Sequence, residues 1–295
     1  MSKKLNRSTG VTIAVYVGLI FFMLFMMIPF YVIIANTITG ASEMQASEHF
    51  IALPSEVNIT TILELLTGTN LLENEESIWN GASMLVVGYW NMFWQGIPRT
   101  IVSLVASGLA GYAYCKLQFK GKNGLFAFQI SLMMIPGACL SIPTYLYYDA
   151  LGWVGTVLPL IIPGLFGGAA TIFFMKQFFE SIPTEIIEAA RIDGLDEISI
   201  FFKIILPLAM PAFITQFILA FVGCYNSYMG PLLYIPQHMH LHPIQMVIQN
   251  DLITSFGSAS FEAAKVLGSI IPICIVYLFG QKFIISGITS GAVKG

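Results

Sequence analysis

Long apolar blocks, separated by short polar segments, set the pattern of this chain. Each block is long enough for a helix to cross about 30 Å of hydrocarbon. The pattern predicts an all-α polytopic membrane protein with six transmembrane helices, near residues 11–35, 97–115, 125–148, 154–177, 206–229 and 265–285. It also predicts four parts of the chain: an N-terminal tail with the first helix (1–35), an external segment (36–96), a transmembrane core (97–285) and a C-terminal tail (286–295).

The distribution of basic residues predicts the orientation. Eleven of the thirteen Lys and Arg residues fall on one side of the predicted spans. The other side has only Arg99 and Lys265, at span ends from which long side chains reach the interface. Because an excess of Lys and Arg marks the cytoplasmic side, both termini are expected to be cytoplasmic, with the acidic segment 36–96 outside.

Helix-disturbing residues interrupt two of the spans. Pro136 and Pro143 lie in the third span, and Pro163 and Gly167 lie in the fourth. Such breaks are tolerated where neighbouring helices or a water cavity satisfy the freed peptide groups, although kinked packing helices fit the same pattern. In the second span the small residues Ser103, Ser107 and Gly111 recur every four positions, which predicts close contact with another helix.

The composition narrows the function. Hydrophobic residues make up 56% of the chain and charged residues 10%, which excludes a cytosolic enzyme. The net charge of −3 leaves no basic surface for nucleic acid. The four cysteines lie far apart in apolar runs, so they form neither a disulfide framework nor a zinc site. His238, His240 and His242 would share one face if extended, but no acid or cysteine joins them, and we expect a surface loop without metal.

The predicted spans lack the chemistry of a self-contained transporter. Their central parts hold no acid or histidine, so the ion relay of a secondary carrier is missing. A phosphate-cradling G-x-x-x-x-G-K-[ST] loop is also missing, so the chain is expected not to be an enzyme. A secondary carrier, and a membrane sensor or scaffold without a path of its own, stay open as alternatives.

A charged helix–turn–helix is predicted between the fourth and fifth spans, at residues 178–205. Pro183 suits the first turn of a helix, and the acids that follow suit its positive end. Gly194 can take the left-handed conformation that stops a helix, and Asp196 can cap a second one. Helical spacing places Ile182, Ile186, Ala189 and Ala190 on one face, where another protein could approach closely.

This segment carries a specific motif. It resembles the E-A-A-x3-G-x9-I-x-L-P loop of permeases in ATP-binding-cassette (ABC) importers. The matching residues are Glu188-Ala189-Ala190, Gly194, Ile204 and Leu206-Pro207, at the same spacing. The final residues 291–295, Gly-Ala-Val-Lys-Gly, resemble the tail of the maltose-type, MalG-like carbohydrate branch. The resemblance covers roughly residues 97–295. The chain departs from the family at Tyr225-Asn226, where a Trp-Asn pair is common, and at Leu195, where a small residue is common.

The resemblance implies a type I importer permease in a prokaryotic cell membrane. Its partners would be a second permease subunit, two ATPase subunits that carry ATP and Mg, and an external solute-binding protein, with a carbohydrate as substrate. This chain itself would need no cofactor. The loop residues implied to couple to an ATPase subunit are Glu185, Glu188, Ala189, Ala190, Arg191, Asp193, Gly194, Leu206 and Pro207. A further contact with the ATPases is implied for the tail residues Val293, Lys294 and Gly295.

A sugar path needs aromatic faces together with amide and hydroxyl groups. The candidates on the third and fifth spans are Tyr145, Gln216, Tyr225, Asn226 and Tyr228. Tyrosines also anchor helices at the membrane interface, which is the competing interpretation for them. For Asn226 the competing interpretation is a hydrogen bond to a neighbouring helix, because lipid exposure of an amide is costly.

Overall fold

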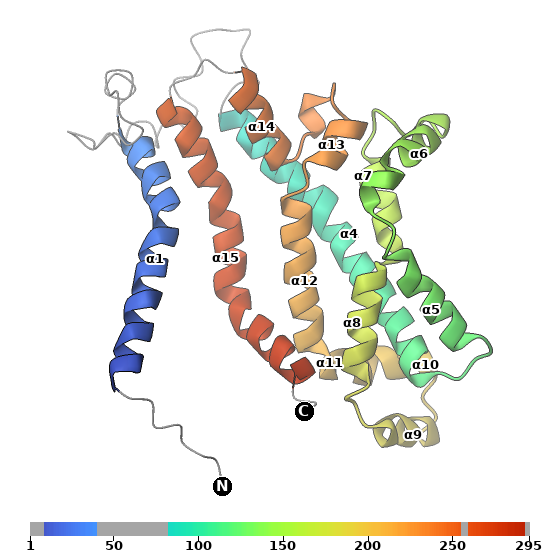
Figure 1. Cartoon of the computed structure of the whole chain (residues 1–295). Helices are drawn as coiled ribbons and strands as arrows, with labels where there is room; N and C mark the ends of the chain where they lie inside the picture. Colours follow the sequence, from blue (N-terminus) through green and yellow to red (C-terminus); the bar gives the residue numbers. More distant parts are fainter. Residues whose placement is uncertain (1–8, 40–81, 255–258, 293–295) are drawn as a thin grey trace. The chain divides into compact units, whose positions relative to one another are not determined.

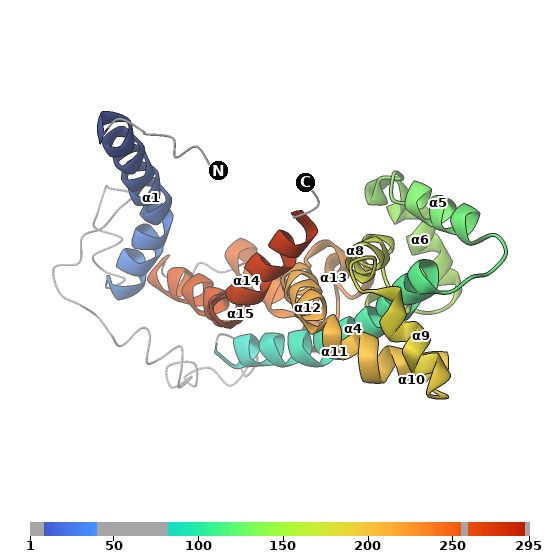
Figure 2. The same cartoon turned by 90° about the horizontal axis from the view of Figure 1, so that it is seen from below.

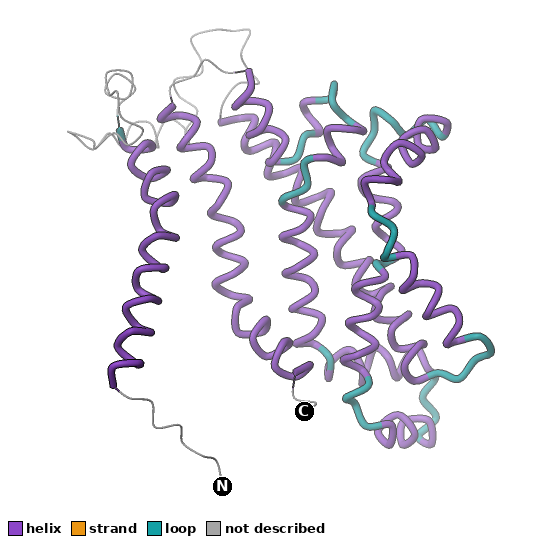
Figure 3. Tube along the Cα trace, viewed as in Figure 1, coloured by secondary structure: helices purple, strands orange, loops and turns teal. Residues whose placement is uncertain are grey.

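The computed structural model describes residues 9–39, 82–254 and 259–292, and within these ranges every regular element is helical (Figures 1 and 3). The α-helices are α1 (Thr9–Ile38), α4 (Ala82–Lys116), α5 (Lys122–Leu132), α6 (Gly137–Ala150), α7 (Leu158–Ile161), α8 (Ala169–Phe179), α9 (Thr184–Ile192), α10 (Glu197–Ile200), α11 (Leu206–Leu208), α12 (Met210–Tyr225), α13 (Met229–Tyr234), α14 (Ile244–Thr254) and α15 (Ala259–Ala292). Two 3-10 helices, η3 (Ile162–Phe166) and η5 (Met239–Leu241), and one π-helix, η4 (Phe201–Ile205), complete the elements.

The chain divides into two compact units. One comprises Met1–Ser83 and Asp251–Ile270 and contains the apolar helix α1. The other comprises Met84–Asn250 and Ile271–Gly295 and contains nearly all of α4, the elements from α5 to α13, and parts of α14 and α15. The coupling segment and the candidate path residues therefore belong to this second unit.

By length and hydropathy, three helices in the described ranges qualify as membrane spans, or five if each bent pair counts as one span. The three are Gly10–Ile38, Leu158–Phe179 and Ala263–Phe283. The bent pairs are α5 with α6, at 94°, and Glu197–Leu208 with α12, at 80°. The remaining predicted span, the second at 97–115, lies in α4, whose apolar residues share the helix with Asn91, Gln95 and Arg99.

The predicted breaks in the third and fourth spans are present. Pro136 precedes α6 in an extended conformation, so the predicted span at 125–148 is two helices rather than one. In the fourth span the backbone changes from α7 to the 3-10 turn η3 and then reaches Gly167 at φ 83°. Proline removes a helical donor, and only glycine adopts a positive φ without strain, which explains both interruptions.

Close backbone contacts join α4 to α8 and α12. A Cβ added at Gly111 would lie 3.0 Å from Cβ of Met175 and 3.1 Å from the backbone nitrogen of Lys176 on α8. A Cβ at Gly108 would lie 2.5 Å from the ring of Phe213 on α12. Ser107 Oγ accepts a hydrogen bond from Gly168 N at 3.3 Å, at the start of α8. The predicted small-residue interface is thus confirmed.

The end of α15 packs along α12, as Figures 1 and 2 show. Thr215 Oγ1 on α12 donates to the carbonyl of Phe283 at 3.0 Å. Gly280 allows the close approach, because a Cβ there would lie 2.3 Å from the side chain of Ile218. A glycine and a small hydroxyl residue therefore let these two long helices lie side by side.

The histidine stretch is held by α4 and is not extended. Asn91 Nδ2 donates to the carbonyls of His240 at 2.7 Å and His242 at 3.1 Å, and Gln95 Nε2 donates to Leu241 O at 3.0 Å. Residues 239–241 form the 3-10 turn η5, which replaces the extended conformation considered from the sequence. Among the residues that the structure describes, no group of three or more His, Cys, Asp or Glu side chains is placed to hold a metal ion.

Candidate coupling surface and translocation path

Helix α9 begins and ends where its sequence predicts. Pro183 precedes it at φ −56°, and Gly194 follows it at φ 84°, in the left-handed region. Gly194 N donates to Arg191 O and Leu195 N donates to Ala190 O, both at 3.1 Å, which is the Schellman pattern of helix termination. The chain can therefore reverse direction within three residues and enter α10 through the N-cap position at Asp196.

One face of α9 is anchored in the core of its own chain. Ile187 is fully buried and Ala190 is 4% exposed. They join Phe179 of α8, Phe201 of η4 and Phe213 of α12 in one apolar cluster. Burial of a side chain such as Ile187 stabilises this arrangement by about 1.5–3 kcal/mol. The apolar core therefore fixes α9 onto the ends of α4, α8 and α12.

The exposed face of α9 differs from the face expected from spacing. The four residues expected on one accessible face are divided: Ile182 and Ala190 are buried in their own chain, whereas Ile186 is 40% exposed and Ala189 is also exposed. The buried residue in this stretch is Ile187, which lies about 100° round the helix axis from Ile186. Ala190 therefore packs inside its own chain and is not available for contact with another protein.

The outward surface combines acids with bare apolar side chains. Among the predicted coupling residues, Glu185, Glu188 and Asp193 are exposed, as is Pro207 on α11, while Leu206 is half-buried. Ile192 is 87% exposed and Ile198 on α10 is 64% exposed. We call the exposed residues of α9 and α10 the α9 surface: Glu185, Ile186, Glu188, Ala189, Ile192, Asp193 and Ile198. Large exposed apolar groups ringed by polar ones mark interaction sites in proteins.

A polar network fixes the turn between α9 and α10 to α4. Arg191 Nε donates to Glu197 Oε1 at 2.7 Å, and Tyr112 Oη on α4 donates to Glu197 Oε2 at 2.6 Å. The guanidinium, and then the phenol, lower the pKa of the Glu197 carboxyl group. The carboxylate is therefore ionised near neutral pH, and any stabilisation is lost only as the pH falls through that lowered value. Because Arg191 and Glu197 are each 40% exposed, solvent limits this pair to well under about 1 kcal/mol.

The sequence pattern did not identify Tyr112 or Glu197 as site residues. They are 85 positions apart, and the residues around Tyr112 give no sign that its hydroxyl group binds a distant carboxylate. Only the fold brings the phenol to the carboxylate.

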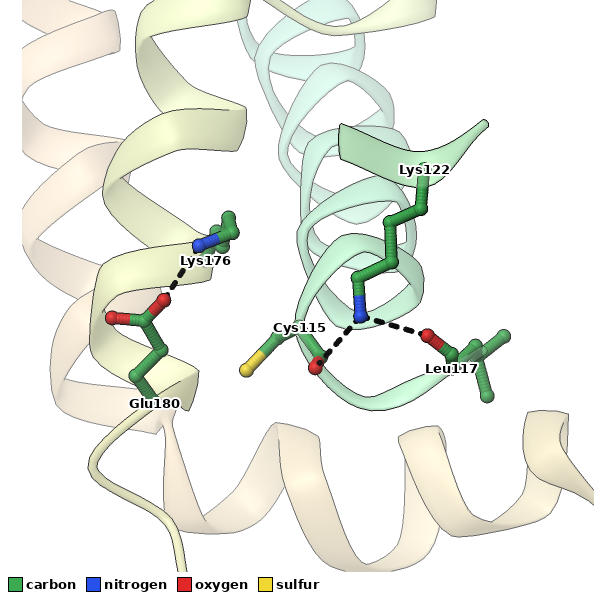
Figure 4. Close-up of polar contacts among 5 residues, drawn as sticks. All are labelled: Cys115, Leu117, Lys122, Lys176 and Glu180. Atoms are coloured by element: carbon green, nitrogen blue, oxygen red, sulfur yellow. Dashed lines mark hydrogen bonds and ion pairs between the residues drawn. The ribbon is translucent and has the colours of Figure 1, made fainter. Parts of the chain in front are cut away.

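Lysines tie the same end of the unit together (Figure 4). Lys122 Nζ donates to the carbonyls of Leu117 at 2.8 Å and Cys115 at 3.3 Å, which are otherwise unpaired at the end of α4. Lys176 pairs with Glu180 at 2.5 Å along α8. Lys116 Nζ donates to Ile182 O at 2.6 Å, just before α9. The Lys122 and Lys116 contacts join the end of α4 to the start of α5 and to the segment before α9, and the Lys176–Glu180 pair lies at the end of α8.

The candidate path residues do not all face one space. Tyr225 is fully buried and shares a side-chain hydrogen bond with Tyr89 of α4. Asn226 is exposed at the end of α12. Tyr145 is half-buried and stacks on Tyr234 with ring centroids 6.2 Å apart. Gln216 and Tyr228 are also half-buried, on α12 and just before α13. The tail residues Val293, Lys294 and Gly295 lie outside the described residues.

Within the described residues, apolar helices interrupted at proline and glycine are typical of a multi-pass membrane protein. Residues 108–290 match the family described as binding-protein-dependent transport system inner membrane component. The match covers more than half of the sequence, so the chain belongs to this family. It is a multi-pass protein of the cell membrane and the membrane-embedded component of a transport system.

Curated relatives match most of the chain. The arabinooligosaccharides transport system permease protein AraQ of Halalkalibacterium halodurans is 34% identical over 239 residues, which are 80% of this chain and 84% of the relative. The trehalose/maltose transport system permease protein MalG of Thermococcus litoralis is 32% identical over 66% of this chain and 71% of its own length. Both relatives are permease proteins of transport systems named for sugars.

A solved structure shares the fold. It is a chain of a bacterial ABC transporter involved in the import of the acidic polysaccharide alginate, with a TM-score of 0.76 and 23% identity. The superposition covers 96% of this chain and 98% of the other. The likeness supports an ABC importer permease fold for this chain.

Proposed function

We propose that this chain is one of two permease subunits of an ATP-driven importer that takes up oligosaccharides from an external binding protein. Family membership and the sugar-named relatives support this over a secondary carrier or a sensor. The observation that carries the coupling role is the α9 surface. It is a helix anchored by its own core on one side, with exposed isoleucines and acids on the other.

The α9 surface would seat in a cleft of one of two ATPase subunits, which carry the ATP and Mg. Acids at Glu185, Glu188 and Asp193 suit basic residues in that cleft, and Ala189 permits close approach. Leu206 and Pro207 lie outside this contact with the ATPase, at the bend into α12. Closure of the ATPase pair would move α9, and the buried core together with the Arg191–Glu197–Tyr112 network would pass this movement to α4 and α12. Binding energy would thereby shift the inward-facing and outward-facing populations.

The finer topology belongs to the same proposal. Six spans follow if α4 crosses the membrane together with the five other candidates, and the Lys and Arg distribution places both termini in the cytoplasm. In that orientation the tail residues Val293 to Gly295 would be on the side of the ATPases and could contact them.

Reporter fusions test this orientation. Reporters placed after Lys122, Lys203 and Gly295 are expected to read as cytoplasmic, and those at Glu75 and His240 as external, because basic residues gather on the first side. Alkaline phosphatase and fluorescent-protein fusions give opposite signals on the two sides. An external signal at Lys203 would remove the α9 surface from the cytoplasm and contradict the coupling role.

Substrate contact is proposed for the exposed or half-buried candidates, namely Asn226, Tyr145, Gln216 and Tyr228. Their amide and phenol groups suit sugar hydroxyls, and their exposure leaves them available to a path completed by the second permease. Tyr225, which is buried against Tyr89, is proposed to support Asn226 rather than to touch sugar.

Transport by the whole complex tests the proposed function. The chain, its second permease, the ATPases and the binding protein are reconstituted in proteoliposomes with ATP inside. We expect accumulation of an oligosaccharide that stops on ATP depletion and is insensitive to an uncoupler. Uptake that collapses with the uncoupler alone would indicate a secondary carrier, and ATP hydrolysis without any sugar flux would indicate a sensor or scaffold.

A further inference from the structure

Arg99 lies at the centre of α4, with seventeen helical residues on either side. The sequence placed it at a span end, because the apolar block starts at 97, whereas α4 starts at Ala82. At 1.5 Å per residue, Arg99 is about 25 Å along the helix from Lys116. If α4 spans a hydrocarbon core of about 30 Å, this guanidinium lies within the membrane, and any tilt of the helix brings it closer to the midplane.

The fourth span is broken at the point where Arg99 meets it. A Cβ at Gly164, inside the 3-10 turn η3, would lie 1.9 Å from Nε of Arg99, so the guanidinium rests directly on the backbone. Irregular backbone at membrane depth is tolerated where it is buried in protein or lines a water-filled cavity. Position 164 therefore has no space for a side chain while the guanidinium of Arg99 packs against it.

A small cavity adjoins Arg99. It has a volume of about 30 Å³ and a mainly apolar lining, to which Gln95 and Arg99 of α4, Cys224 near the end of α12 and Ser227 just after α12 contribute polar atoms. Asn226, a candidate path residue, lies between Cys224 and Ser227 in sequence. A space of this size holds one or two water molecules, or the oxygens of one carboxylate, but not a sugar ring.

Arg99 has no counter-charge within the described part of the chain. Its side chain is half-buried, and no hydrogen bond or ion pair joins it to another described residue. A cation inside a membrane protein is costly unless an anion or a strong acceptor compensates it. Three features favour an anion site, namely a charge without a partner among the described residues, a break in the facing helix and a small cavity beside the guanidinium.

We propose that Arg99 is a substrate-recognition residue that binds the carboxylate of an acidic, uronic-acid-containing oligosaccharide as it passes along the chain. This inference rests on the proposed import function and assigns it a substrate class. The guanidinium would hold the carboxylate through two parallel N–H···O bonds, with the sugar ring outside the cavity, beside Asn226. A neutral sugar would leave the charge of Arg99 uncompensated, whereas a uronate satisfies both the charge and the planar, forked geometry of the guanidinium.

Cys224 reports the local potential directly. In the reconstituted complex, with the chain's other cysteines (Cys115, Cys139 and Cys274) replaced by Ser, Cys224 is treated with an anionic and a cationic methanethiosulfonate of similar size. We expect the ratio of anionic to cationic rates to fall about tenfold in Arg99→Gln, because one nearby charge is lost in a low-dielectric site. Arg99→Lys keeps the charge and should keep most of the ratio. Lys120→Gln removes an exposed charge from the loop after α4 and should leave the ratio unchanged.

Protection by sugar tests the ligand class. Oligogalacturonate should slow the modification of Cys224 in the wild-type complex, and its uncharged methyl ester should not. Arg99→Gln should lose this protection, and Arg99→Lys should weaken it. Equal anionic and cationic rates, an unreactive Cys224 or equal protection by acid and ester would each overturn the proposal. A variant Arg99→Gln that no longer assembles with the second permease would do so too, because a partner carboxylate would then be the counter-charge.

The same preparation separates this inference from the proposed function. ATP-dependent uptake of neutral oligosaccharides without any effect of uronate on Cys224 leaves the import function standing and removes the acidic substrate. Absence of ATP-dependent uptake for acidic and neutral oligosaccharides alike contradicts the import function itself, whatever the rates at Cys224.

Discussion

Gly194→Pro is expected to leave the chain in the membrane but to reduce ATP-dependent uptake at least tenfold. Gly194 has φ 84°, which the proline ring forbids, and its N–H donates to Arg191 O at 3.1 Å. Loss of the left-handed turn and of this hydrogen bond destabilises the local conformation by about 2–3 kcal/mol. The turn sets the direction of α10 relative to α9, so the α9 surface would no longer match its seat. Transport assays and co-purification of the ATPase subunits measure the effect.

A second turn provides a matched control. Gly152 follows α6 with φ 68°, its N–H donates to Asp149 O at 2.9 Å, and Trp153 N donates to Tyr148 O at 2.9 Å. This is the same Schellman pattern, and a Cβ would meet nothing within 4 Å at either glycine. Gly152→Pro therefore applies the same local strain away from the α9 surface and should retain the ATPase subunits. Equal loss of the ATPases in both variants would attribute the effect to general misfolding, and normal uptake in Gly194→Pro would remove α9 from coupling.

Features that depend on a few neighbouring residues were predictable from the sequence. The start of α9 after Pro183, its end at Gly194 and the N-cap position of Asp196 follow from local backbone preferences. The breaks in the third and fourth spans follow from proline and glycine in the same way. The contact of Ser107 and Gly111 with α8 was also visible, because small residues every four positions have few other uses in a membrane helix.

Features that depend on what packs against a helix were not predictable. Spacing alone placed Ile182, Ile186, Ala189 and Ala190 on one face open to another protein, because a helix with apolar groups on most sides offers several possible faces. In the structure Ile187 is buried instead, because it packs into the apolar cluster that contains Phe179, Phe201 and Phe213. The starting point of α4 was missed for a related reason. Residues 82–96 are too polar to read as a span, yet they extend the same helix and move Arg99 to its centre.

The relative strengths of the contacts decide what anchors α9. The Arg191–Glu197 pair is exposed to solvent and contributes well under about 1 kcal/mol, whereas burial of Ile187 contributes about 1.5–3 kcal/mol. The network with Tyr112 therefore orients the turn, and the apolar cluster supplies most of the stability. A rigid link between α9 and the long helices depends chiefly on buried contacts, which salt does not screen.

A cysteine scan of α9 is expected to separate the two faces almost completely. Cysteines at Ile186 and Ala189 should crosslink efficiently to the ATPase subunit, because both positions belong to the exposed α9 surface. Cysteines at Ile187 and Ala190 should give only background crosslinking, because those positions are 0% and 4% exposed. Neighbouring positions differ in outcome because successive residues of a helix are 100° apart. The measurement uses the assembled complex and a short thiol-to-amine reagent.

Ala189→Cys and Ala190→Cys form the decisive pair, since both add one sulfur atom to the same residue type. The sulfur at 190 enters the core beside Ile187, so a thermal melt of the complex should show a small loss of stability without crosslinking. The sulfur at 189 should crosslink at unchanged stability. Crosslinking at 190 as strong as at 189 would mean that α9 leaves the core when the ATPase binds. The movement of the ATPases could then not reach α4 and α12 through the buried cluster. Because the proposed coupling route depends on that cluster remaining closed, this pair tests the route itself as well as the location of the contact.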